Sequence, residues 1–218
     1  MTKGKLIIIE GCDGCGKSTL IKNLKSFYKN NPDIIFVKEP AHTKFGESIF
    51  NLIKANNISE EIKMHLFCAE RLELLDKVII PALEDGKTVI SERFALSTWA
   101  YQCSKDNTLI PTLKSILNSL KKKVNVDATI YFRAVPNDVL DESASVEEKT
   151  NLGHLLLWYS VALQAQEFPN ELLGEIFNLD TANKASQNFE LAKVFINGRI
   201  NSQKHNSDCG LASGEETI

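Results

Sequence analysis

Residues 5–27 constrain the fold of this chain more than any other stretch. They comprise a short β-branched run, "KLIIIEG", the glycine-rich "CDGCGKST" and the amphipathic "IKNLKSF". This order predicts a buried strand, a tight turn and a helix. Within the turn, Gly11-x-x-x-x-Gly16-Lys17-Ser18 has the spacing of a P-loop, whose backbone amides bind phosphate oxygens at the N-terminus of a helix.

The same turn contains a second pattern, Cys12-x-x-Cys15, which is typical of a redox dithiol or of half a zinc site. Zinc needs about four ligands, and the sequence has no second CxxC and no spaced Cys/His pair. A redox site would have to share a turn already used to bind phosphate. We therefore interpret Cys12 and Cys15 as small residues that fill loop positions, although a thiol at a helix N-terminus can still be reactive.

The P-loop pattern predicts that the chain binds ATP with Mg²⁺. Lys17 would reach the terminal phosphates and Ser18 would bind the metal ion, while the amides of residues 14–17 surround phosphate oxygens. The predicted ATP-binding residues are Gly11, Cys12, Asp13, Gly14, Cys15, Gly16, Lys17, Ser18 and Thr19.

Apolar runs alternate with helical patterns along the rest of the chain, which predicts an α/β fold with a parallel sheet covered on both faces. Pro81 is expected to divide the long helical pattern that begins at Ser59 or to open a second segment. One domain is predicted for residues 1–200, followed by a disordered tail at 201–218. Further strands are predicted at 33–40, 88–91, 127–135 and 175–181, and helices at 59–86, 94–103, 109–123 and 185–198, the last ending near Gly198.

Composition and charge restrict the classes of protein to which this chain can belong. A chain of 218 residues with 43% hydrophobic residues can bury one full core. Its net charge of -3 predicts no broad nucleic-acid surface, and we interpret the run at 121–123 as the solvated end of a helix. No apolar run approaches the ~18 residues of a membrane span or forms a signal peptide. With five cysteines at irregular spacing, these features favour a cytoplasmic location.

Several motifs occur in a characteristic order: "EGCDGCGKST", "KEPAHTKFGESI", "LFCAERLELLDKVIIPALEDGKTVISERF" and "STWAYQ". Through them the chain resembles the thymidylate kinase family from about Leu6 to Gln102. The resemblance implies a P-loop nucleoside monophosphate kinase fold, with a five-stranded parallel sheet flanked by helices. It also implies transfer of the γ-phosphoryl group of Mg·ATP to dTMP, which gives dTDP for dTTP synthesis, and a homodimer.

The resemblance also assigns a base-binding site. Phe67 and Arg71 lie four apart and so share one side of a helix, whereas the stripe of Ile62, Leu66 and Ala69 would face the core. By resemblance, Phe67 would stack on thymine and Arg71 would bind its exocyclic oxygen. The resemblance also predicts that Thr98 and Gln102 contact the base or the sugar.

The phosphate end of the predicted substrate site involves three residues at steps of four, Arg93, Ser97 and Tyr101, which would share one side of a helix. The resemblance implies that Arg93 holds the acceptor phosphate and that Tyr101 crowds the sugar 2′ position. It further implies that Asp13 helps to position phosphate or Mg²⁺.

Two further segments are assigned by the resemblance. Glu39-Pro40 would line the monophosphate site, in a segment where "EPAHT" replaces the family's "EPGGT", so that His42 is interpreted as a loop residue near the substrate and not as a base. Glu92 would lie next to the metal, where the family usually has Asp.

One expected feature of the family is missing. Thymidylate kinases place an additional arginine in the P-loop or in the lid after the fourth strand, where it stabilises transition-state charge. The P-loop position here is Gly14, and the lid, predicted near 141–154, is acidic (Asp141, Glu142, Glu147, Glu148) with Lys149 as its one Lys or Arg. Arg133 could supply the charge or pair with the acidic lid.

These departures leave alternatives open. The chain could be a broader deoxynucleoside monophosphate kinase. It could also be a deoxynucleoside kinase in which Glu92 acts as a base, or a nucleotide-binding protein that has lost turnover.

Overall fold

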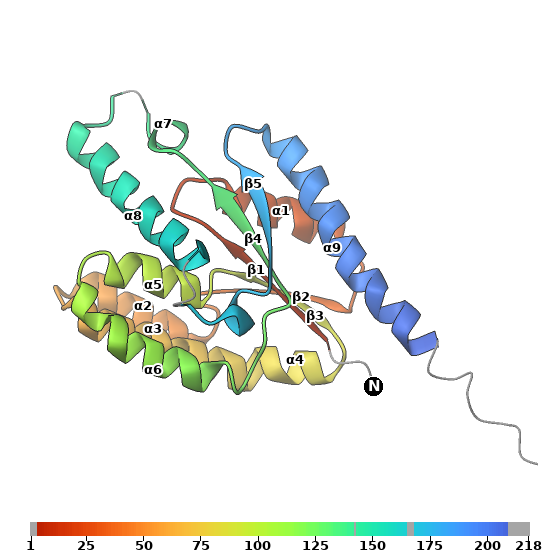
Figure 1. Cartoon of the computed structure of the whole chain (residues 1–218). Coiled ribbons are helices and arrows are strands. Elements are labelled where there is room, and N and C mark those ends of the chain that lie inside the picture. Colours follow the sequence, from red (N-terminus) through yellow and green to blue (C-terminus); the bar gives the residue numbers. More distant parts are fainter. Residues whose placement is uncertain (1–3, 142, 165–167, 209–218) are drawn as a thin grey trace, which may run out of the picture.

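The computed structural model describes residues 4–141, 143–164 and 168–208 of the chain (Figure 1). Five parallel strands form one sheet in the order β2-β3-β1-β4-β5, which confirms the predicted α/β architecture. The strands are β1 (Lys5–Glu10), β2 (Ile34–Lys38), β3 (Thr88–Glu92), β4 (Ala128–Arg133) and β5 (Glu175–Asp180).

Helices connect the strands and cover both faces of the sheet. The helices are α1 (Lys17–Phe27), α2 (Lys44–Ala55), α3 (Glu60–Leu74), α4 (Ile80–Glu84), α5 (Ala95–Cys103), α6 (Ile110–Leu120), α7 (Pro136–Val139), α8 (Val146–Gln164) and α9 (Ala185–Asp208). A π-helical turn, Leu75–Ile79, joins α3 to α4. Pro81 lies in the first turn of α4, so it opens a second segment, where its missing N–H costs nothing.

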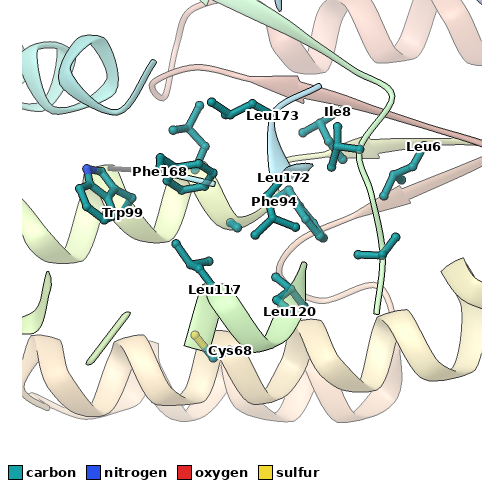
Figure 2. Packing of buried hydrophobic residues seen from close by; sticks show 14 of the residues in the cluster. Leu6, Ile8, Cys68, Phe94, Trp99, Leu117, Leu120, Phe168, Leu172 and Leu173 are labelled. Atoms are coloured by element: carbon teal, nitrogen blue, oxygen red, sulfur yellow. The ribbon is translucent and has the colours of Figure 1, made fainter. Parts of the chain in front are cut away.

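The sheet separates two hydrophobic cores because the side chains of β1 alternate between its faces. Leu6 and Ile8 belong to the core formed with α3 to α6 and α8, whereas Ile7 and Ile9 belong to the core formed with α1 and α9. Figure 1 shows α9 and α5 on opposite sides of the sheet. In the first core (Figure 2), Trp99 packs edge to face on Phe168 with ring centroids 5.8 Å apart. Both faces of the central strand are therefore buried, as its continuous apolar run predicts.

Three helices, α2, α7 and α8, were not predicted from periodicity, although capping signals for α2 and α8 are present in the sequence. The Thr43 side chain caps α2 by accepting from the Gly46 amide at 3.1 Å. Ser145 and Glu148 form a reciprocal capping box at the start of α8, each side chain accepting from the other's amide. The predicted acidic lid is thus largely the first turns of a helix.

Two other expectations are wrong. On α3, Ile62 is 49% exposed and the buried residues include Met64 and Cys68 instead, because the helix packs against α2 and α5. The final helix does not end near Gly198 but continues to Asp208. Disorder of the tail stays a prediction, and residues 209–218 lie outside the described residues.

The loops that follow β1, β2 and β3 leave the sheet at one edge. The parallel register aligns Ile9 with Glu92 at the end of β3, and Glu92 with Lys38 at the end of β2. The P-loop, the 39–43 segment and the connection into α5 are consequently neighbours, at the edge where open α/β sheets bind ligands. No helix among the described residues is long and apolar enough to cross a membrane.

Candidate active site

The loop between β1 and α1 has the strand–turn–helix setting that the P-loop pattern predicts. Gly16 caps α1 with a φ of 102°, a left-handed conformation that glycine adopts without strain. The Lys17 side chain is buried, and its Nζ donates to the carbonyl of Gly11 at 2.9 Å and to that of Cys12. Binding a triphosphate therefore requires this ammonium group to exchange carbonyl partners for phosphate oxygens.

The two predicted metal ligands are adjacent. Ser18 Oγ donates to Glu92 Oε1 across 2.9 Å, although the two residues come from different loops. Both line a cavity with the P-loop glycines Gly14 and Gly16. A hydroxyl and a carboxylate are hard oxygen ligands of the kind that Mg²⁺ prefers, so the pair fits this ion.

Arg93 occupies the connection between β3 and α5. It lies outside the helix that was predicted to carry it, with a φ of 70°, a left-handed conformation that is strained for a residue with a Cβ. Its Nη1 donates to Ser97 Oγ at 2.9 Å and to the carbonyl of Gly11 at 3.1 Å, and its Nη2 donates to Asp13. The guanidinium group thus bridges the P-loop and α5.

Two side chains donate hydrogen bonds to the carboxylate of Asp13. Its carboxylate accepts from Arg93 and, at 2.9 Å, from the hydroxyl of Tyr101. Burial acts to raise the pKa of Asp13, but the charge of Arg93 and the Tyr101 hydrogen bond lower it below its ordinary value. Asp13 therefore remains ionised and orients the arginine predicted to hold the acceptor phosphate.

Two buried residues of this network were missed by sequence reasoning. Glu10 is fully buried and accepts from the Phe94 amide at 2.8 Å and from Ser97 Oγ at 2.7 Å. Tyr159, on α8, donates from its hydroxyl to the Gly11 carbonyl at 3.2 Å. Their only sequence signal is a polar group within an apolar pattern, which does not reveal the partner.

A second cavity, of about 290 Å³, adjoins the phosphate loop. Its lining contains every predicted substrate-binding residue: Glu39, Pro40, Phe67, Arg71, Arg93, Ser97, Thr98, Tyr101 and Gln102. Phe67 and Arg71 line the same cavity, as their spacing on α3 predicted.

Arg71 is fixed within this cavity by two partners. Its Nε donates to Glu39 Oε2 at 2.8 Å and its Nη2 donates to Thr98 Oγ1 at 2.9 Å. The ion pair is nearly inaccessible, with side-chain exposures of 4% and 5%. Cys68 also interacts with the guanidinium group, which carries five N–H donors in all and lines the cavity.

Phe50 and Glu70 also line the cavity, and sequence reasoning missed both. Phe50 comes from α2, so an aromatic ring from each of two helices borders the same space.

Within the described residues, neither carboxylate oxygen of Glu70 meets the geometry of a hydrogen bond. Burial raises the pKa of Glu70 to about 7, against the attraction of Arg71, so this carboxyl can hold a proton near neutral pH. Burial also acts to raise the pKa of Glu39, but Glu39 lies in an ion pair with Arg71 that opposes this shift.

The segment after β2 keeps the shape of a glycine-containing loop although its glycines are replaced. Ala41 has a φ of 76°, and this left-handed conformation costs a residue with a Cβ about 1–2 kcal/mol. His42 is exposed in this loop and is absent from the cavity lining, so its predicted position near the substrate stays a prediction. Pro40 lies beside them on the cavity wall.

The remaining predicted ATP-binding residues divide into two groups. Gly14, Cys15, Gly16 and Thr19 line a third cavity together with Asp138, Thr181, Asn183 and Asn188. Through Asn188 the lining of this cavity extends to α9. Cys12 and Gly11 line none of the three cavities, but their carbonyls hold Lys17.

The predicted pairing of Arg133 with the acidic lid is wrong, whereas its supply of transition-state charge stays a prediction. Its Nη2 pairs with Asp180 at the end of β5 at 2.9 Å, and its side chain is 68% exposed. It lines none of the three cavities and its partner is not in the acidic lid. Asp141 and Glu148 instead accept from Ser143 and Ser145, while Glu142 lies outside the described residues.

The fold and the site define a P-loop protein of the nucleotide kinase class, in which a phosphate-binding loop adjoins a second, base-sized cavity. Residues 9–190 match the family model described as "Thymidylate kinase". The match covers most of the chain and continues well beyond Gln102, so the chain belongs to the thymidylate kinase family.

Individual relatives agree with this assignment. A thymidylate kinase of Thermoanaerobacter sp. (strain X514) is 36% identical over 141 residues, covering 63% of this chain and 70% of the relative. A thymidylate kinase of Mycoplasmoides gallisepticum is 36% identical over 160 residues, covering 71% and 74%. A thymidylate kinase of Pseudoalteromonas translucida is 38% identical over 138 residues, covering 62% and 66%.

Proposed function

We propose that this protein transfers the γ-phosphoryl group of ATP to dTMP, giving dTDP and ADP. The observation that carries the proposal is that Asp13 and Arg93 line both the P-loop cavity and the 290 Å³ cavity. A donor phosphate on the P-loop and an acceptor phosphate on Arg93 would therefore meet at one place. Bringing the two groups together is most of what an enzyme contributes to phosphoryl transfer.

The position of each residue indicates which part of the two nucleotides it would bind. Lys17 and the loop amides would hold the donor phosphates, and Arg93, oriented by Asp13, would hold the acceptor phosphate. Phe67 would stack on thymine, while the guanidinium group of Arg71 would donate to its exocyclic oxygen. Gln102, whose amide already lies 3.4 Å from Glu60 Oε2, would contact the base or the sugar.

Ser18 and Glu92 are the residues that would hold Mg²⁺. When bound with ATP, this ion neutralises phosphate charge and lowers the barrier to transfer. No cluster of three or more acidic, His or Cys side chains suited to a metal occurs in the part of the chain that the structure describes. Phosphate and water oxygens would therefore complete the coordination.

The placement of Glu92 argues against a nucleoside kinase. Glu92 accepts from Ser18 and lines the P-loop cavity, but it is absent from the lining of the 290 Å³ cavity. A base that activates a sugar 5′-hydroxyl must lie within hydrogen-bond reach of it. The homodimer and the cytoplasmic location stay predictions drawn from the family resemblance and the composition.

The test is release of ADP from Mg·ATP, with dTMP, dUMP, dCMP, dGMP and thymidine supplied separately. We expect turnover mainly with dTMP, and weaker turnover with dUMP because one methyl group distinguishes the two by only about 1–3 kcal/mol. Phosphorylation of thymidine alone would contradict the proposal. ATP binding without turnover on any acceptor would show that catalysis has been lost.

A further inference from the structure

The two cysteines of the P-loop belong to one buried cluster, the core formed with α1 and α9. Cys12 is fully buried and Cys15 is 5% exposed, and Lys17 Nζ donates to the Cys12 carbonyl and lies 3.6 Å from Cys15 Sγ. Gly11 leaves room for this arrangement, because a Cβ on it would lie 2.8 Å from Cys15 Sγ. The thiols therefore occupy space that the loop provides for them, in the CxxC spacing that allows two sulfurs to bond.

The two thiols differ in what surrounds them. Cys15 Sγ lies 3.6 Å from the ammonium group of Lys17 and borders the cavity on the α9 side of the loop, together with Gly16 and Thr19. Cys12 lies behind it and borders none of the three cavities. A small oxidant can thus approach Cys15 from the cavity, and Cys12 is the nearest second thiol.

The pKa shifts of the two thiols also favour Cys15 as the one that reacts first. Interaction with the Cys12 thiol lowers the pKa of Cys15 to about 7, with burial opposing and Lys17 assisting. The same interaction and burial raise the pKa of Cys12. Thiolates are the nucleophilic form of cysteine.

We propose that Cys15 is an oxidation site for hydrogen peroxide and that Cys12 resolves it as a disulfide within the P-loop. The Cys15 sulfur attacks one peroxide oxygen, the O–O bond breaks, and a sulfenic acid and water result. The Cys12 thiol then attacks the Cys15 sulfur, forming the S–S bond and releasing a second water. Two thiols are oxidised while one peroxide is reduced to two waters.

The disulfide would change the phosphate site. It would draw Cys15 Sγ away from Lys17 and alter the backbone whose amides surround phosphate, so oxidation should abolish ATP binding. This consequence rests on the proposed function, whereas formation of the bond does not. Bound ATP should in turn slow the oxidation, because it occupies the approach to Cys15.

The first experiment treats the full chain with hydrogen peroxide, in a Cys209→Ser background, and measures intact mass and disulfide-linked peptides. We expect loss of the mass of two hydrogen atoms, mapped to a Cys12–Cys15 bond and reversed by dithiothreitol. Cys15→Ser should abolish the bond, and Cys12→Ser should leave a sulfenic acid on Cys15 that dimedone traps. Cys103→Ser, a buried thiol in the other core, is the matched control and should oxidise like the parent.

A bond that involves Cys68 or Cys103, or oxidation of Cys15 without a disulfide in the parent, would overturn the proposal. If a variant fails to fold, the peptide map of the parent still decides it. A second measurement compares ATP binding before and after oxidation, and unchanged binding would overturn the link to the phosphate site. Because the mass data do not depend on catalysis, a chain that never phosphorylates dTMP would still test the disulfide.

Discussion

Arg71 Nε donates to Glu39 Oε2 across 2.8 Å in a nearly inaccessible ion pair. The pair joins α3 to the segment after β2, and both residues line the cavity. The contact therefore has two consequences, one for stability and one for recognition of the base.

Replacing Arg71 by methionine should affect both. Removal of one partner from a buried ion pair typically costs about 3–5 kcal/mol of unfolding free energy, and the lost donors should raise KM for dTMP. Thermal unfolding and steady-state kinetics measure the two effects. Arg133→Met is the matched control, since its exposed pair with Asp180 should contribute less than about 1 kcal/mol. Equal losses in the two variants would contradict this account of the pair.

Phe50 and Phe67 should both contribute to binding of the base. Stacking on an aromatic ring is worth about 1–3 kcal/mol per base, so replacing either residue by leucine should lower kcat/KM for dTMP by about 5- to 150-fold. The control is Phe45→Leu, on the same helix as Phe50 but 46% exposed and outside the cavity. If Phe50→Leu behaves like Phe45→Leu, then Phe50 only borders the cavity and does not bind the base.

Glu70 should make stability depend on pH. Its pKa is raised from 4.5 to about 7 in the folded chain, chiefly by burial, so the folded state holds a proton that the unfolded state releases. Its contribution is fully present below pH 4.5, falls as the pH rises towards 7 and is constant above that.

Glu70→Gln removes this dependence. The variant should gain about 1–3 kcal/mol of unfolding free energy relative to the parent between low and neutral pH. Denaturant unfolding at a series of pH values measures the difference. Glu61→Gln, exposed on the same helix, should follow the parent at every pH, and a Glu70→Gln curve parallel to the parent would show that burial does not perturb this carboxyl.

Tyr101 should have separable roles for its hydroxyl and its ring. Tyr101→Phe removes the hydrogen bond to Asp13, worth about 1 kcal/mol, and should lower kcat about fivefold while preference for deoxyribose persists. Tyr101→Ala should also raise kcat/KM for the ribonucleotide relative to dTMP. Competition assays with the two sugars measure this ratio, and loss of sugar preference in Tyr101→Phe would assign it to the hydroxyl instead.

Lys149 should supply the charge that a lid arginine provides in relatives. Arg133 is already paired with Asp180, and Lys149 is the one Lys or Arg in residues 141–154. Lys149→Met should lower kcat at least about tenfold, with little change in KM for dTMP, because transition-state charge is affected more than binding. Arg133→Met should retain the parental kcat, and a larger loss in that variant would reverse the assignment.

The local spacing of residues in the sequence was enough to predict the P-loop, one pair of cavity residues and the parallel sheet. The P-loop and its setting between β1 and α1 were predictable because its glycines and Lys17 lie within one short stretch of chain between a strand and a helix. The shared location of Phe67 and Arg71 followed from helical periodicity. The alternating strands and helices predicted the parallel sheet, since a strand buried on both faces has a continuous apolar run.

Only the tertiary structure decided the partners that come from distant parts of the chain. Glu10 reaches Ser97, Tyr159 reaches Gly11, and Arg133 pairs with Asp180, because strand register and helix packing place their backbones together. No local pattern encodes these choices. The two cavities meet at Asp13 and Arg93. This also depends on tertiary structure, because the loops after β1 and β3 leave the sheet next to each other.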